Sequence, residues 1–223
     1  MTEKALDFEA LHIGVDDVSW QMGYRDAQPD ERVVVEVRGL LDEVSAVVVP
    51  RFCYVVKWGT LGKGSLDVDG VHLSIGTRIA RQLSRSEAFA FFVATAGKEY
   101  ESFQGKVARE GNLLRVFIAD ALGSLIAERC ADLMERSLQE SIEKLDWKHT
   151  NRFSPGYCNW HVSEQPLLFS LIGEKPCGIL LNEGCLMTPI KSVSGIVGVG
   201  HDVERLDYAC ALCGKKDCLF KHP

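Results

Sequence analysis

The residues best suited to bind a ligand lie in a short stretch where Arg152 and Tyr157 flank a Pro-Gly pair. Pro155 restricts φ and Gly156 tolerates positive φ, so the pair predicts a tight turn that lets a ligand approach the backbone closely. Arg152 could hold a carboxylate through two hydrogen bonds, and Tyr157 could cover a flat ring. An ordinary surface loop with an exposed arginine is the alternative interpretation.

A long helix is predicted from residue 113 to about residue 145, because apolar residues recur on one broad face. Asp120 and Glu128 would lie about two turns apart on neighbouring faces. Glu128 has apolar neighbours, so it is either semi-buried and in need of a cation or simply solvated. Gly123 costs the helix about 1 kcal/mol relative to alanine, a cost that a close neighbour would explain.

A second cluster of reactive residues is the C-terminal set Cys210, Cys213 and Cys218. Two thiolates at C-x2-C spacing form the smallest chelating unit for zinc or an iron–sulfur cluster. Structural thiols, or a thiol-redox enzyme using Cys210 and Cys213, remain alternatives. A fourth ligand would come from a partner or from elsewhere in the chain, where the candidates are His222, His201 and Cys185.

Other catalytic motifs are weak or missing. The chain has no Gly-x-Ser-x-Gly elbow and no His-Glu-x-x-His zinc motif. The glycine-rich segment 59–65 is too short for a phosphate-binding loop and predicts a hairpin turn or a flexible loop. A nucleophilic pair of Cys158 and His161 has no further support in the sequence.

The overall composition is that of an ordinary globular protein. Of its 223 residues, 46% are hydrophobic and 25% are charged, and the net charge is -6. This balance gives no basic surface for nucleic acid or an anionic membrane. The sequence shows no apolar run of transmembrane length and no signal peptide, so we expect a cytoplasmic protein whose eight cysteines are reduced.

The remaining segments alternate between helices and short strands, which predicts an α+β fold with a mostly antiparallel sheet. The apolar run 88–94 is typical of a strand buried on both faces. Residues 1–12 predict a lead-in or an edge strand, and 185–189 a loop. Further helices are expected at 16–23, 31–44, 164–172 and after an N-cap at Ser74. Further strands are expected at 47–49, 52–56, 71–73, 179–181 and 196–199.

Three motifs, in order, resemble the activation domain of cobalamin-dependent methionine synthase over residues from about 115 to 200. They are Ala127-Glu128 on the long helix, Arg152-x-x-Pro-Gly-Tyr157, and Gly178 to Leu180 followed by Pro189 and Ser192-Val-Ser-Gly195. The N-terminal half is similar only to stand-alone members of the family, through Met22-Gly-Tyr24-x4-Pro29 and Ala94-Thr-Ala-Gly97.

The resemblance implies a C-shaped α+β unit around a twisted antiparallel sheet. We therefore expect one compact unit with an N-terminal α/β portion (1–100), a core similar to the activation domain (101–205) and a cysteine-rich tail (206–223).

The resemblance also implies an accessory role in methyl transfer: binding S-adenosylmethionine and reactivating an oxidised corrinoid by reductive methylation. No catalytic side chain is implied, because reduced cobalt is the nucleophile. The matching positions are Glu128, Arg152, Ser154, Pro155, Gly156 and Tyr157. Supporting positions are Asp120, Ser192, Ser194 and Gly195. The implied partners are a corrinoid-carrying methyltransferase or truncated methionine synthase, and an electron donor such as a flavodoxin or a ferredoxin.

Two of the sequence's departures from the family bear most on its function. It contains no Asp-x-His-x-x-Gly corrinoid-binding motif, so the cobalamin would be carried by a partner protein. The aromatic residues that follow Ser-Val-Ser-Gly in the family are replaced by Ile196, Val197 and Gly198. The alternative is therefore a non-catalytic corrinoid- or metal-binding chaperone module that kept the fold and lost the S-adenosylmethionine chemistry.

Overall fold

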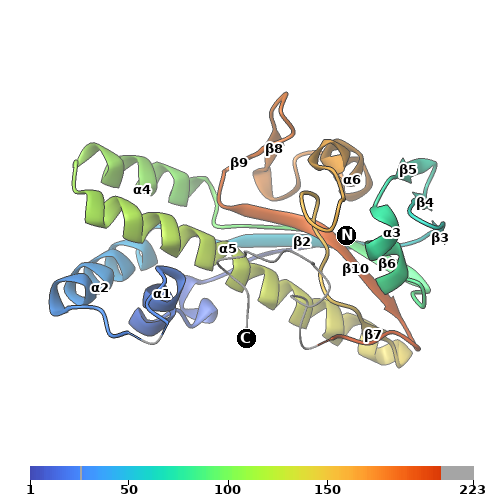
Figure 1. The fold of residues 1–223 in the computed structure, drawn as a ribbon, viewed down its shortest axis with the longest axis horizontal. Helices are drawn as coiled ribbons and strands as arrows, with labels where there is room; N and C mark the ends of the chain where they lie inside the picture. The colour runs from blue at the N-terminus through green and yellow to red at the C-terminus, as the bar shows by residue number, and fades with distance from the viewer. Residues whose placement is uncertain (26, 207–223) are drawn as a thin grey trace.

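A curled antiparallel sheet is the centre of the computed structural model, which describes residues 1–25 and 27–206 (Figure 1). All neighbouring strands of this five-stranded sheet are antiparallel, which confirms the predicted fold class. In spatial order they are β1 (Thr2–Ala5), β2 (Arg51–Trp58), β6 (Ala88–Thr95), β10 (Ser192–Gly200) and β7 (Lys148–His149).

Helices and small strands cover both faces of the sheet. The first core contains residues of α1 (Val15–Gln21), α2 (Glu31–Ser45), α4 (Lys98–Arg109), α5 (Leu113–Ile142) and η1 (Phe8–Leu11). The second core contains residues of α3 (Gly76–Gln82), α6 (Gln165–Ile172), η4 (Pro176–Gly178), β4 (Leu66–Val68) and β5 (Val71–Leu73). The other short elements are β3 (Thr60–Leu61), η2 (Glu143–Leu145), η3 (Val162–Glu164), β8 (Leu180–Leu181) and β9 (Met187–Thr188).

Strand β6 separates the two cores. All eight of its residues are buried, as the apolar run predicts. Successive side chains of a strand point to opposite faces. Ala90 and Phe92 therefore pack in the first core, whereas Phe91 and Val93 pack in the second. Strand β6 thus contributes side chains to both cores, as do β2 and β10.

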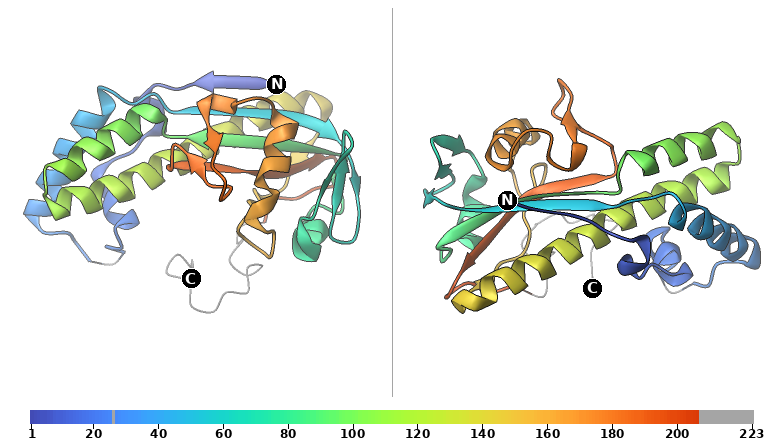
Figure 2. Two further views of the ribbon diagram at one scale, coloured as in Figure 1. Left: turned by 90° about the horizontal axis from the view of Figure 1, so that it is seen from above. Right: turned by 180° about the vertical axis from the view of Figure 1, so that it is seen from behind.

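The outline of the molecule is the predicted C. In the left view of Figure 2, the helical end and the end that carries β3 to β5 project to the same side of the sheet. Among the described residues, no helix combines the length and the apolar composition that a bilayer crossing requires. The proposed boundaries at residues 100 and 205 stay a prediction. The first core does draw on both sides of residue 100, for example through Val37 and Leu122.

Most predicted elements are confirmed, but the short strands β3, β4 and β7 were not predicted, and four further differences follow. Residues 47–49 form no strand, because the N–H groups of Val47 and Val48 bond to the carbonyl of Val44 at the end of α2. Ser74 does not cap α3: Ile75 holds that position, and the Ser74 N–H donates to Glu164. Strand β9 lies inside the predicted loop 185–189. Helix α4 was missed, although Tyr100, Phe103 and Val107 recur on one buried face.

Gly123 allows two helices to approach closely. A Cβ atom at this position would overlap Cε1 of Tyr100 in α4 and would lie 2.8 Å from Cγ of Lys191. The Tyr100 hydroxyl donates to the carbonyl oxygen of Ala119, one turn earlier in α5. The close neighbour that the sequence suggested for Gly123 is therefore Tyr100.

We expect Gly123→Ala to destabilise the protein by roughly 1–3 kcal/mol, because the added methyl group overpacks the contact between α4 and α5. Gly39→Ala is the matched control, since a Cβ at Gly39 in α2 meets nothing within 4 Å. That substitution should stabilise the protein by up to about 1 kcal/mol through helix propensity. Urea unfolding measures both changes, and a Gly123→Ala protein as stable as wild type would contradict this packing account.

Candidate functional site

The Pro-Gly segment forms the predicted tight turn. The N–H of Tyr157 donates to the carbonyl of Ser154 at 3.2 Å, and Gly156 has a φ of 95°. The N–H of Gly156 donates to the carbonyl of Trp160 at 2.7 Å. The N–H groups of Gly156 and Tyr157 are therefore both used inside the loop, which makes the turn rigid.

The strand beside the turn fixes its position. Phe153 and Ile196 exchange two backbone hydrogen bonds, of 2.9 and 2.8 Å, so the segment that carries Arg152 lies along β10. Gly195 makes this approach feasible, because a Cβ there would overlap the carbonyl oxygen of Phe153. The glycine of the Ser-Val-Ser-Gly motif thus positions the turn by lacking a side chain.

Arg152 joins the turn to helix α5 through three carboxylates. Its Nη1 lies 3.0 Å from Oδ1 of Asp132 and 3.2 Å from Oε2 of Glu135, and its Nη2 lies 3.2 Å from Oε2 of Glu128. The three acids are spaced i, i+4 and i+7, so they share one face of the helix. Their mutual repulsion is offset by the guanidinium between them.

The buried acid of this group is Glu135. Its side chain is only 4% exposed, whereas that of Glu128 is 56% exposed. Arg205 at 3.6 Å and His149 at 3.9 Å also face Glu135. A charge in such a place needs partners. Sequence analysis missed Glu135, although its position between the apolar residues Met134 and Leu138 is a signal of burial.

Glu128 is the acid most able to change partners. The surrounding protein partly excludes water, and this desolvation raises the pKa of the Glu128 carboxyl. Asp132 and Glu135 raise this pKa further, and Arg152 opposes them. Solvent screens these effects because the side chain is more than half exposed. Its negative charge is thus incompletely compensated by the protein.

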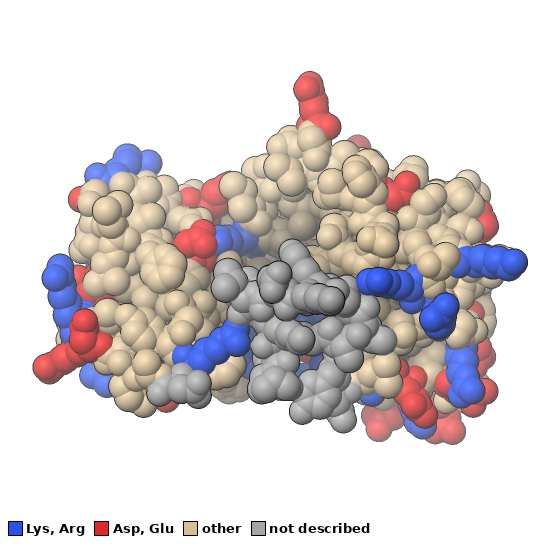
Figure 3. All heavy atoms as spheres, viewed as in Figure 1, with Lys and Arg blue, Asp and Glu red and all other residues tan. Residues whose placement is uncertain are grey.

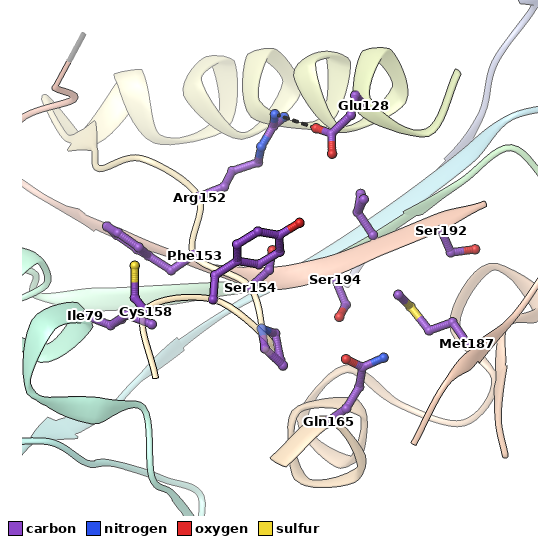
Figure 4. Close-up of a pocket in the computed structure, with 13 residues that line it drawn as sticks. Ile79, Glu128, Arg152, Phe153, Ser154, Cys158, Gln165, Met187, Ser192 and Ser194 are labelled. Atoms are coloured by element: carbon purple, nitrogen blue, oxygen red, sulfur yellow. Dashed lines mark hydrogen bonds and ion pairs between the residues drawn. The ribbon is translucent and has the colours of Figure 1, made fainter. Parts of the chain in front are cut away.

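Glu128 and Arg152 line a cleft of about 390 Å³ whose floor is β10. Figure 4 shows the two side chains at the α5 side of the cleft, with Gln165 on α6 at the opposite side. On the face seen in Figure 3, a hollow with mainly uncharged walls lies over β10, bordered by α6 and the β8–β9 hairpin. The volume is within the usual range for small-molecule sites.

The cleft brings together most of the predicted residues. Among its lining residues are Glu128, Arg152, Ser154, Pro155, Tyr157, Ser192 and Ser194. Asp120 is not among them, since it pairs with Lys191 at 2.7 Å. The Ser192 hydroxyl is occupied, with Oγ 2.7 Å from both Thr95 Oγ1 and the Pro189 carbonyl. The lining residues that sequence analysis did not propose are Ile79, Phe153, Cys158, Gln165, Met187 and Val193.

The predicted cysteine site belongs to the C-terminal tail. Cys210, Cys213 and Cys218, with His222, are outside the described residues, so the zinc or iron–sulfur proposal stays a prediction. Within residues 1–25 and 27–206, no group of three His, Cys, Asp or Glu side chains could hold a metal ion. His201 pairs with Glu87 at 2.6 Å.

Comparisons with known proteins identify the family and the fold. The model of the family described as "Vitamin B12 dependent methionine synthase, activation domain" matches residues 69–218, more than half of the chain. A solved structure, "Crystal Structure of the MetH Reactivation Domain bound to AdoHcy", is similar with a TM-score of 0.67 and 18% sequence identity. The match covers 91% of this chain and 79% of that one, and it shows a shared fold. A search of curated proteins found no match.

Removing Arg152 should destabilise the protein by about 3 kcal/mol, because the charge of buried Glu135 loses its nearest cation. We expect Arg152→Met combined with Glu135→Gln to lose less stability than the sum of the two single changes. A double-mutant cycle measured by urea unfolding gives this coupling. Additive effects would show that the contact does not hold the turn to α5.

Proposed function

The chain belongs to the family of vitamin B12-dependent methionine synthase activation domains, and we propose that its cleft binds S-adenosylmethionine to reactivate a corrinoid protein. The related MetH reactivation domain was crystallised with AdoHcy, the demethylated form of this ligand. Support from the chain itself comes from the charges around the cleft, because S-adenosylmethionine carries a carboxylate, an ammonium and a sulfonium.

The paired charges of the cleft carry the proposal. Glu128 and Arg152 are the charged side chains that line it, whereas Asp132, Glu135 and Arg205 line a separate hollow behind them. The cleft therefore offers one anion and one cation, which complement the positive groups and the carboxylate of S-adenosylmethionine. A nucleoside without charged groups would leave both side chains unused.

Binding would exchange partners within the charged group. In the free protein, Glu128 and Arg152 form an ion pair, with Oε2 of Glu128 3.2 Å from Nη2 of Arg152. Glu128 would turn from Arg152 to the positive groups of the ligand, which its exposed position permits. Arg152 could then take the ligand carboxylate with two parallel hydrogen bonds, while Glu135 continues to hold the guanidinium from behind.

The residues of this chain would position the methyl group without taking part in covalent chemistry. The partner's corrinoid, when reduced, would supply the nucleophile for the methyl group. Glu128 and Arg152 would fix the amino acid end of the ligand. Pro155 and Tyr157 at the rigid turn would cover its nucleoside and exclude water. Asp120, paired with Lys191, would act at most indirectly.

The partners follow from the same proposal. The corrinoid would be carried by a methyltransferase or a truncated methionine synthase, and a flavodoxin or ferredoxin would supply the electron, in the cytoplasm. The tail with Cys210, Cys213 and Cys218 would bind zinc as a structural unit or an iron–sulfur cluster that helps to pass the electron.

One observation favours the alternative of a non-catalytic binding module. Ile196 and Val197, which replace the aromatic residues of the family, are both fully buried, one in each core. Their side chains present no surface to a corrinoid. The metal-binding form of the alternative would need no such surface.

Glu128→Gln should weaken S-adenosylmethionine binding about fivefold, or 1 kcal/mol, because one anion opposite the ligand's positive charge is lost. S-adenosylhomocysteine lacks the sulfonium charge, so its affinity should change less. Glu9→Gln is the matched control, because Glu9 is exposed and belongs to η1, away from the cleft. Isothermal titration calorimetry measures the affinities.

Absence of S-adenosylmethionine binding to wild type would refute the proposed function. Equal loss of affinity for both ligands would refute the role of Glu128. Once binding is established, a corrinoid partner, a reductant and isotope-labelled S-adenosylmethionine separate the two candidate functions. Label transferred to the corrinoid supports reactivation, and binding without transfer supports the non-catalytic module.

Binding should also release protons at mildly acidic pH. The pKa of Glu128 is raised in the free protein, mainly by desolvation. A bound sulfonium would lower this pKa, so affinity should rise with pH between the free and bound pKa values. Calorimetry in two buffers with different ionisation enthalpies measures the release. Glu128→Gln should abolish it, and an unchanged release in that variant would contradict the assignment.

A further inference from the structure

Two buried polar side chains in the cleft lack protein partners. Gln165 is 4% exposed and Ser194 is 2% exposed, and both line the cleft. Within residues 1–25 and 27–206, neither side chain forms a hydrogen bond to another protein group. Neither contributes to the side-chain nitrogen and oxygen atoms that are sealed from solvent without a partner, so their polar atoms face the open space of the cleft. A ligand in the cleft can therefore form hydrogen bonds with these groups in place of water.

The backbone positions both groups firmly. Gln165 is the first residue of α6, and the apolar side chains of Leu168 and Leu171 anchor that helix in the second core. Ser194 lies in the middle of β10, paired with Val93 of the buried strand β6. Figure 4 shows the Gln165 amide directed from α6 toward Ser194 across the cleft. These are pre-organised groups on rigid elements, as ligand recognition requires.

Ser192 provides an internal comparison. It has the same residue type as Ser194, lies two residues earlier on the same strand and lines the same cleft. Its hydroxyl is satisfied by Thr95 and Pro189, as described above. The lack of partners at Ser194 is therefore specific to the position opposite Gln165.

We infer that Gln165 and Ser194 recognise the adenine base of the bound nucleoside, an inference that rests on the proposed function. An amide offers a donor and an acceptor in one plane, which matches the adenine edge, where an amino group adjoins a ring nitrogen. The Ser194 hydroxyl can serve a further base or ribose atom. Ile79 and Met187, which also line the cleft, supply apolar surface for the faces of the ring.

The arrangement of the cleft agrees with this assignment. Glu128 and Arg152 lie at the α5 side, and Gln165 lies at the α6 side, with β10 between them. A ligand whose amino acid end occupies the charged side would extend its nucleoside end toward the amide. The α5 side of the cleft would thus bind the amino acid end of the ligand, and the α6 side would bind its base.

The test pairs a side-chain change with a ligand change. The probes are S-adenosylmethionine and its 6-desamino analogue, whose purine ring lacks the exocyclic amino group. Wild type should prefer the adenine compound on the order of tenfold. Gln165→Leu keeps the size and helical position, and it should bind both compounds with nearly equal affinity. Calorimetry measures the four affinities, and thermal unfolding confirms that the variant is folded.

Two further variants keep the test decisive. Ser194→Ala is a smaller change that should weaken S-adenosylmethionine binding by a few-fold. Gln28→Leu makes the same substitution as Gln165→Leu at an exposed residue before α2, and it should leave the preference unchanged. If wild type binds S-adenosylmethionine but Gln165→Leu retains the full preference for the amino group, this inference is wrong and the proposed function stands. If wild type binds neither compound, both fail.

Discussion

The guanidinium of Arg152, surrounded by three carboxylates of one helix, is the interaction on which the rest of the site depends. Glu135 is almost fully buried, and a charge in that position is tolerable only beside a cation. Arg152 belongs to the loop before the Pro-Gly turn. Its ion pair with the buried Glu135 therefore holds that loop against α5. Gly195 completes the arrangement by letting the backbone of Phe153 lie against β10.

The acids around Arg152 have different roles, which depend on how deeply each is buried. Glu135 is inaccessible and serves structure, whereas Glu128 is half exposed at the edge of the cleft and can turn to a ligand. One carboxylate and one guanidinium at this side of the cleft suit a ligand that carries both a positive and a negative group. The opposite side of the cleft has uncharged polar groups and apolar walls, which suit a nucleobase. The cleft thus has one charged and one uncharged side, which match the charged amino acid end and the uncharged base of S-adenosylmethionine.

The sequence predicted what depends on local pattern. Periodicity identified α5 and the buried strand β6, and residue chemistry identified the turn at Pro155-Gly156 and the need for space at Gly123. The family resemblance, carried by the motifs around Arg152 and Gly195, anticipated the fold. Gln165 was missed, because distant segments that the local sequence does not show decide its burial. Glu135 was missed although its apolar neighbours signal burial, since its partner Arg152 comes from a distant loop.

The most direct measurement is a crystal structure of the protein with S-adenosylmethionine. The account predicts the ligand carboxylate on Arg152, the sulfonium beside Glu128 and the adenine against Gln165. The 3.2 Å contact between Glu128 and Arg152 should be broken while the contact of Arg152 with Glu135 persists. A ligand bound elsewhere, or bound in the cleft with the Glu128–Arg152 pair intact, would contradict the account.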